Sequence, residues 1–214
     1  MGNVHEVARR FVPAAALNWR PVLVAPLRSW QSRCMHRLRL AASAAACTVG
    51  YRLLVRGALT VDTGWGRTLR PLGPFSIDID ATPEAVFDII AEPYLKRTPH
   101  AMADKLKVIE RGTDMVLAAH NTPVRPGLVA TTVETVRFER PTLVSFRLVR
   151  GPVPHVVEHF TLHRRESGTT VEYTGEMGTD FWAAGRWWGE RVARKWEATV
   201  RSSFTSIRSA AERR

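Results

Sequence analysis

Three histidines spaced four residues apart, with a glutamate among them, are the residues of this chain whose types and spacing best suit chemistry. His155, His159, His163 and Glu158 lie in a segment whose Val- and Phe-containing composition favours a β-strand. Residues four apart on a strand are separated by about 13 Å, whereas two imidazole nitrogens bound to one zinc ion lie within roughly 4 Å of each other. Adjacent histidines of this row therefore cannot share a metal ion. We expect no metal site here, and all three histidines are predicted to face outward.

Glu158 lies on the opposite face of the same predicted strand, between Val156 and Phe160. Burial among apolar neighbours raises the pKa of a carboxyl group, and a carboxyl that exchanges its proton near neutral pH can orient a ligand or act as a general acid or base. Glu158 is therefore our candidate catalytic residue. The alternative is structural: Glu158 reaches water near the end of the strand or pairs with an arginine.

Further candidates come from the same alternation of inward and outward positions. Tyr173 alternates with Val171 and Met177 on the inward side of a later strand, and it combines an apolar ring with a hydroxyl. The direction in which His120 and Glu134 face is not fixed by alternation, so both are secondary candidates. The predicted ligand-binding residues, which the core could equally use, are Glu158, Phe160, Tyr173, Met177, Trp182, Trp188 and Val192.

The elements that must position these residues begin with a strand and a helix. Phe75–Asp80 alternates apolar and polar residues, which predicts a half-buried strand. Thr82 is a predicted N-cap and Pro83 suits the first helical position, so a helix should follow directly. Pro93 is expected to end it.

Six more strands are predicted before the chain becomes helical again. Short turn sequences such as Gly112-Thr113-Asp114 and Glu166-Ser167-Gly168 separate them. No helix-length periodic segment interrupts them, which favours one curved antiparallel sheet over a parallel one. The predicted strands are Lys105–Arg111, Met115–Asn121, Val129–Glu139, Leu143–Val149, Val156–Arg164 and Thr170–Thr179.

A long amphipathic helix is predicted from Phe181 to the end of the chain, over some 25 to 30 residues. Asp180 is its expected N-cap, and Glu190–Arg194 and Glu197–Arg201 are expected ion pairs one turn apart. We expect the helix to lie across the concave face of the sheet through its apolar stripe, which comprises Trp188, Val192, Trp196, Val200, Phe204, Ile207 and Ala211.

Two glycines near the start of that helix have two interpretations. Gly185 and Gly189 each weaken a helix by about 1 kcal/mol relative to alanine. They either allow the helix to pack closely on the sheet or allow a ligand to approach its backbone.

The order of these elements resembles the SRPBCC superfamily, the START-like group that includes polyketide cyclases and lipid-transfer domains. The resemblance rests on FSIDIDATPEAVFDIIAEP (75–93), EHFTLHRRESGTTVEYTGEM (158–177) and the Trp-rich final helix (182–211). It implies an α+β helix-grip fold, with a seven-stranded curved antiparallel sheet wrapped on the C-terminal helix and an apolar cavity between them. It further implies binding or transfer of a small apolar ligand such as a lipid or polyketide. The alternative is a cyclase or dehydratase that uses a pocket carboxylate.

Charge and composition divide the 214 residues into two parts. Residues 1–72 hold eleven Arg and two acidic residues, whereas residues 73–182 hold twelve basic and fifteen acidic ones. We therefore predict a basic N-terminal extension, 1–72, partly helical or disordered, and a helix-grip domain, 73–214. Pro13, Pro21 and Pro26 break the early extension into short pieces. The two cysteines cannot make a disulfide framework, so a reducing compartment is expected.

The basic extension suggests a second partner, an anionic membrane contacted at its surface. Its longest uncharged run, Leu40–Tyr51, is shorter than the roughly 20 residues of a membrane span, so no transmembrane helix is expected. We predict a cytoplasmic or membrane-peripheral protein, with export from a start at Met35 as the alternative. The slightly acidic strand region argues against specific nucleic-acid binding. The sequence contains no phosphate-binding glycine motif, so no cofactor is expected.

Overall fold

The computed structural model describes residues 28–96, 98 and 102–213, and the predicted breaks at Pro13, Pro21 and Pro26 lie outside these residues. The chain divides between Ala44 and Ala45 into two compact units, and the first helix contributes residues to both. The elements in chain order are α1 (Arg28–Val55), β1 (Thr68–Ile79), α2 (Pro83–Leu95), β2 (Leu106–Arg111), β3 (Met115–Arg125), β4 (Leu128–Glu139), β5 (Leu143–Arg150), β6 (His155–Arg165), β7 (Gly168–Thr179) and α3 (Trp182–Ala211).

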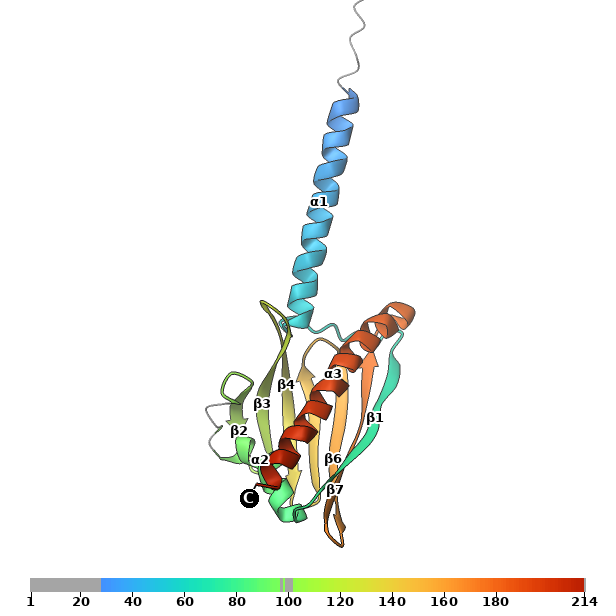
Figure 1. Cartoon of the computed structure of the whole chain (residues 1–214). Helices are drawn as coiled ribbons and strands as arrows, with labels where there is room; N and C mark the ends of the chain where they lie inside the picture. The colour runs from blue at the N-terminus through green and yellow to red at the C-terminus, as the bar shows by residue number, and fades with distance from the viewer. Residues whose placement is uncertain (1–27, 97, 99–101, 214) are drawn as a thin grey trace, which may run out of the picture. The chain divides into compact units, whose positions relative to one another are not determined.

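The predicted α+β helix-grip fold is confirmed. Seven antiparallel strands form one sheet in the order β1-β7-β6-β5-β4-β3-β2. Figure 1 shows α3 lying across one face of this sheet, with α2 near the C-terminal end of α3. Each strand pairs with its neighbour in sequence, except that β1 and β2 form the two edges because α2 separates them.

β1 begins at Thr68, earlier than the predicted strand start at Phe75 and before the predicted domain boundary at residue 73. Pro71 and Pro74 lie within this strand, although proline cannot donate a ladder hydrogen bond. β1 is an edge strand, where proline is tolerated, and its register with β7 shifts between Leu72 and Phe75.

α2 starts as predicted but ends later. Thr82 is the N-cap, and its hydroxyl accepts a hydrogen bond from the backbone N–H of Ala85 at 3.3 Å. Pro93 was expected to end the helix, and this was wrong, since the helix continues to Leu95 with Pro93 buried inside it. In the last turn a missing N–H removes a single helical bond, and burial of the proline ring in the core offsets that loss.

The predicted apolar stripe of α3 is confirmed, but three polar predictions around it were wrong. Asp180 does not cap the helix; its carboxylate instead accepts hydrogen bonds from the loop before β1. Glu190 and Glu197 do not pair with arginines of their own helix, because both carboxylates bind the guanidinium of Arg70 on β1. Arg201 lies over the ring of Phe75. These long-range contacts fix α3 to the edge of the sheet.

The two glycines of α3 allow close packing. A Cβ atom at Gly185 would collide with the carbonyl oxygen of Asp180, and one at Gly189 would lie 3.0 Å from the side chain of Thr179. The backbone of the helix therefore lies directly on the chain that leads into it.

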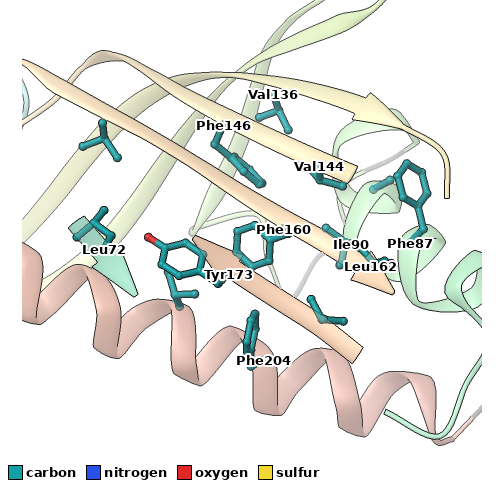
Figure 2. Packing of buried hydrophobic residues seen from close by; sticks show 14 of the residues in the cluster. Leu72, Phe87, Ile90, Val136, Val144, Phe146, Phe160, Leu162, Tyr173 and Phe204 are labelled. Carbon is teal, nitrogen blue, oxygen red and sulfur yellow. The ribbon is translucent and has the colours of Figure 1, made fainter. Parts of the chain in front are cut away.

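The main core lies between the sheet and the two helices α2 and α3. Figure 2 shows side chains from the inner face of the sheet meeting those of α2 and α3. Phe87 and Ile90 come from α2 and Phe204 from α3, while Val144 and Val171 come from the middle of the sheet. Because strand residues alternate in direction, each central strand contributes every second side chain to this core.

The uncharged run Leu40–Tyr51, which lies in α1, was predicted to be too short to cross a membrane. The stretch Met35–Val55 of α1 is nevertheless 21 residues long and, by length and composition, apolar enough to do so. An uninterrupted-run criterion stops at Arg39 and Arg52, whereas arginines near the ends of a span can extend to the interface. By length and composition alone, α1 is therefore a candidate membrane span.

Candidate functional site

Glu158 faces the interior from the middle of β6, as its alternation with Val156 and Phe160 predicted. Only 5% of the residue is exposed. Its Oε2 atom accepts two hydrogen bonds of 2.7 Å, one from the hydroxyl of Tyr173 on β7 and one from the indole N–H of Trp196 on α3. The carboxylate therefore joins the sheet to the helix.

The surroundings of Glu158 raise its pKa to about 7. Burial is the main cause, because it disfavours the charged form, and the negative charge of Glu134 adds to it. The two hydrogen bonds from Tyr173 and Trp196 act in the opposite direction but do not cancel it. Tyr173 titrates far above its usual range, again mainly through burial, so it remains a donor to Glu158.

A second buried acid, Glu134 on β4, lies beside His120 on β3. His120 Nδ1 is 3.1 Å from Glu134 Oε2, and His120 Nε2 is 2.9 Å from the hydroxyl of Tyr94 on α2. Nδ1 is buried without an aligned hydrogen bond, so the contact with Glu134 is mainly between charges. The three side chains come from three different elements and meet on the inner face of the sheet.

The charges of this pair stabilise each other. Burial alone would lower the pKa of His120 and raise that of Glu134, but their mutual attraction outweighs it, so the pKa of His120 is raised and that of Glu134 is lowered. The buried hydroxyl of Tyr94 stays protonated, because desolvation raises its pKa strongly. The contact between the two groups thus favours the ionised form of each.

The two acid groups are close enough to influence each other. β5 alone separates their strands, and its Phe146 is the register partner of Glu158 while its Leu148 is the partner of Glu134. The charge of Glu134 raises the pKa of Glu158, and the charge of His120 lowers it. We name Tyr94, His120, Glu134, Glu158, Tyr173 and Trp196 together the polar row.

The interior beside Tyr173 is filled with aromatic rings. Phe160 lies 5.3 Å from Tyr173 and 5.8 Å from Phe204, measured between ring centroids, and Phe75 stacks on Tyr173 at 4.7 Å. Figure 2 shows Tyr173, Phe160 and Phe204 between the sheet and α3. Part of the expected apolar cavity is therefore occupied by the protein's own side chains.

The structure brings most of the predicted ligand-binding residues to this interior. Phe160 and Met177 are buried in the core, and Val192 and Trp188 of α3 pack against it. Trp188 also donates its indole N–H to the carbonyl of Pro152 at 2.8 Å. Trp182 is not brought there: it is 54% exposed and its ring contacts Trp65 instead.

The three histidines of β6 lie on its outer face, as predicted, and each contacts a different residue. His155 binds Glu176 and His163 binds Glu172, at 2.8 and 3.3 Å, while His159 hydrogen-bonds to Ser145. In contrast, sequence reasoning gave little weight to His120, Glu134 and Trp196. The one signal in the sequence was spacing: Glu134 lies two residues from Thr132 and two from Val136, on the same face of β4. In the structure all three residues are buried.

A surface depression lies at the edge of the sheet near His120. Leu106, the register partner of His120, and Asn121, the next residue along β3, both line it. Its other lining residues are Lys96, Thr98, Ala103, Asp104, Lys107, Val108 and Arg111.

Two solved structures share this fold. The di-domain ARO/CYC BexL from the BE-7585A biosynthetic pathway matches with a TM-score of 0.55 at 15% identity; the match covers 87% of this chain and 61% of that one. The Zhui aromatase/cyclase from Streptomyces sp. R1128 matches with a TM-score of 0.51 at 16% identity, over 69% of this chain and 96% of that one. The chain thus spans less than two thirds of the length of BexL, and at these identities the likeness shows the fold. No curated protein matches the sequence.

The sequence itself matches a family model. Residues 75–212, more than half of the chain, fit the model described as polyketide cyclase / dehydrase and lipid transport. These residues include all six members of the polar row. The chain therefore belongs to the polyketide cyclase / dehydrase and lipid transport family and has the SRPBCC helix-grip fold.

Proposed function

We propose that the helix-grip domain binds a small, mainly apolar ligand, such as a polyketide or a lipid, against the inner face of its sheet, with a polar group of the ligand at Glu158. The observation that carries this proposal is the buried Glu158 carboxyl, whose pKa is about 7 and which no arginine or lysine neutralises among its contacts. Ligand sites commonly combine apolar walls with a few polar groups that fix orientation. The aromatic and aliphatic surroundings of Glu158 fit that description.

Solvent reaches the polar row at His120. The side chain of His120 is 22% exposed, compared with 6% for its partner Glu134. The opposite end, around Tyr173, is closed by aromatic rings. We therefore propose that the ligand enters beside His120, from the edge of the sheet formed by β2 and β3.

Cyclase or dehydratase chemistry is the second candidate, and the pKa of Glu158 favours it. A group with a pKa near the working pH is present in both protonation states, as a general acid–base catalyst requires. In a dehydration, the Glu158 carboxylate would take a proton from a carbon of the ligand, and the resulting acid would return a proton to the departing hydroxyl, so that water leaves. Tyr173 and Trp196 would hold the carboxylate in place.

Native mass spectrometry of the full chain, purified from its own source, tests the binding proposal. We expect a bound species of a few hundred daltons that wild type retains and that Glu158→Gln retains less well. Glu172→Gln is the matched control, because Glu172 lies on the outer face of β7 and is exposed. Equal retention by Glu158→Gln and wild type, or a ligand-free protein, would contradict the proposed role of Glu158.

The same ligand separates the two candidates. Incubation of the released ligand with fresh wild-type protein leaves its mass unchanged if the domain only binds it. A loss of the mass of water that Glu158→Gln fails to cause, and that Glu172→Gln still causes, would establish the enzymatic alternative.

A further inference from the structure

Four large aromatic residues are exposed where α3 begins. Trp65 and Trp182 are 69% and 54% exposed, and Trp187 and Phe181 are 58% and 41% exposed. We call these four residues the aromatic patch. Single exposed apolar side chains are ordinary on a protein surface, but a cluster of them marks an interaction site.

Backbone contacts hold three members of the patch, Trp65, Phe181 and Trp182, together. The N–H groups of Phe181 and Trp182 donate to the carbonyls of Trp65 and Gly66 at 2.8 and 3.0 Å. The rings of Trp65 and Trp182 meet edge to face at 5.5 Å, and the Trp182 ring lies against the backbone of Gly66. Phe181 and Trp182 both have positive φ angles, 70° and 46°, which are uncommon for bulky residues. Strained positions of this kind cluster at functional surfaces.

Two exposed arginines of α3 lie beside the patch in sequence, and one of them contacts it. Arg186 and Arg191 are exposed in the first turns of α3, and the Arg191 guanidinium lies 3.6 Å from the centre of the Trp187 ring. The nearby acidic groups are already paired: Asp180 and Asp62 both bind Arg67. Tryptophan together with arginine is the combination that favours the boundary between lipid headgroups and hydrocarbon.

α1 supplies an independent indication of lipid. Met35–Val55 is 21 residues long, and 6% of this stretch is buried. At 1.5 Å per residue it spans roughly 31 Å, close to the hydrocarbon thickness of a bilayer. No charged residue interrupts any side of the helix between Leu40 and Tyr51. This central part of the helix suits a membrane interior rather than a membrane surface. Arg37, Arg39 and Arg52 lie toward the ends of the stretch, where long side chains can reach the interface.

The C-terminal end of α1 contacts α3 within the second compact unit. Tyr51, in the last turns of α1, contacts Trp188 edge to face at 6.1 Å between ring centroids, and Trp188 follows Trp187 of the patch directly. Arg52 and Arg56 flank the same end of α1, where their long side chains can reach headgroups. Tyrosine, tryptophan and arginine therefore gather at one end of the apolar helix, as at a membrane interface.

We propose that α1 inserts into a lipid bilayer and that the aromatic patch rests in the interfacial layer, so that the helix-grip domain is held at the surface of a membrane containing anionic lipid. This inference does not depend on the proposed function of Glu158.

Fractionation of the full chain tests the insertion. We expect the intact protein, with α1 present by mass, to remain in bacterial membranes after washing with alkaline carbonate and to be released by detergent. A protein recovered from the soluble fraction, or a processed form that has lost α1 as a cleaved signal, would overturn the proposal.

A charged double variant shows whether α1 itself is responsible. Ala46 and Val49 are exposed, so Ala46→Arg with Val49→Arg leaves the helix-grip domain folded. We expect the ratio of membrane-bound to soluble protein to fall at least about tenfold, because arginine at the centre of a bilayer is unfavourable. The matched control, Ala46→Leu with Val49→Leu, keeps wild-type partitioning. An unchanged ratio in the arginine variant would refute insertion.

Fluorescence quenching tests the patch. The full chain is reconstituted into vesicles of phosphatidylcholine and phosphatidylglycerol with bromine on the acyl chains near the headgroup. The difference between wild type and the triple variant Trp65→Phe, Trp182→Phe, Trp187→Phe isolates these three indoles. We expect their fluorescence to be quenched by brominated lipid and protected from aqueous iodide. The reverse result would show that the patch faces water or a protein partner and would refute its place at the interface.

Discussion

Two carboxylates of almost equal burial behave in opposite ways in this molecule. Asp180 and Glu158 are 4% and 5% exposed. The pKa of Asp180 lies far below its usual range, whereas that of Glu158 is raised to about 7. A small exposed fraction therefore does not decide the charge of a carboxylate by itself: desolvation dominates at Glu158, whereas the hydrogen bond from Arg67 dominates at Asp180.

The partners differ in kind. Asp180 receives hydrogen bonds from the Arg67 guanidinium, at 2.8 Å, and from the backbone N–H groups of Thr63 and Gly64. Glu158 receives only a hydroxyl and an indole N–H, both neutral. A cation favours the ionised form of an acid much more strongly than neutral donors do. The contacts of Asp180 thus hold its carboxylate charged and connect the start of α3 to the loop before β1. Glu158, in contrast, can exchange its proton.

Glu134 is an intermediate case. It is as buried as the other two, and its cation is His120, which can lose its charge. Burial raises the pKa of Glu134, but the charge and hydrogen bond of His120 and the hydrogen bond of Thr132 lower it overall. Within the polar row, the contact with His120 therefore favours the ionised form of Glu134, whereas the surroundings of Glu158 favour its protonated form.

Among these substitutions, Gly185→Ala should most severely disrupt the packing of α3 on the segment around Asp180. Its Cβ would collide with the Asp180 carbonyl, and that obstacle is backbone, which cannot rotate away. We expect Gly185→Ala to lower the free energy of unfolding by about 3 kcal/mol or more, measured by urea denaturation. Gly189→Ala meets only the Thr179 side chain and should cost less. Gly50→Ala, whose added Cβ would have nothing within 4 Å, is the control and should not lower the free energy of unfolding. Equal losses at Gly185 and Gly189 would contradict this packing.

Asp180→Asn should replace the favourable contact between Asp180 and Arg67 by an unfavourable one. The amide nitrogen would face the Arg67 guanidinium, so a buried donor would oppose a donor. We expect a loss of about 2–3 kcal/mol in the free energy of unfolding at pH 7. Asp62→Asn is the matched control, because Asp62 binds the same arginine from an exposed position.

The pH dependence of this variant gives a second readout. Because the pKa of Asp180 is lowered in the folded state, its stabilisation is complete above the unfolded pKa of about 4 and declines as the pH falls below that value. Wild type should therefore lose stability between pH 4 and pH 2 more steeply than Asp180→Asn. Parallel curves would show that the Arg67 contact does not hold the carboxylate charged.

Glu158→Gln should reverse that dependence. The pKa of Glu158 is raised to about 7, so the folded state binds a proton that the unfolded state releases near pH 4.5. Wild-type stability should therefore fall by about 2 kcal/mol between pH 5 and pH 8, and the glutamine variant should lack this decline. Chemical denaturation at each pH measures it. Glu172→Gln, on the outer face, should retain the wild-type slope.

Local patterns in the sequence were sufficient for the direction of Glu158 and Tyr173. Each of the two residues lies two positions along its strand from an apolar residue that faces inward. The strands β6 and β7 pair in register along their whole length. Alternation therefore predicted that both face inward. It could not predict that they share a hydrogen bond, because that depends on the register between strands rather than on either strand alone.

The contacts that decide charge were beyond local patterns. Arg67 and Asp180 are 113 residues apart in sequence, and Trp196 and Glu158 are 38 apart. Asp180 before a helix has the local features of an N-cap, and only the folded loop shows that its carboxylate turns to Arg67 instead. Periodicity predicts which face a residue occupies, whereas the partner across the interior depends on how separate elements pack.

Arg70→Ala provides the exposed limit of the comparison. Arg70 binds Glu190 and Glu197 at 3.0 Å each, but all three side chains are partly exposed, with 51% exposure at Glu190. Water and salt screen such pairs, so we expect a loss of only about 0.5–1 kcal/mol in the free energy of unfolding. The difference from wild type should shrink further in 0.5 M sodium chloride, where screening is stronger. Arg137→Ala, whose ion pair with Asp114 is longer and more exposed, is the control for removing a surface arginine. A loss as large as that of Asp180→Asn would mean that Arg70 contributes by packing α3 against β1 rather than by charge. Exposure alone would then not distinguish the arginine contact of Asp180 from those of Glu190 and Glu197.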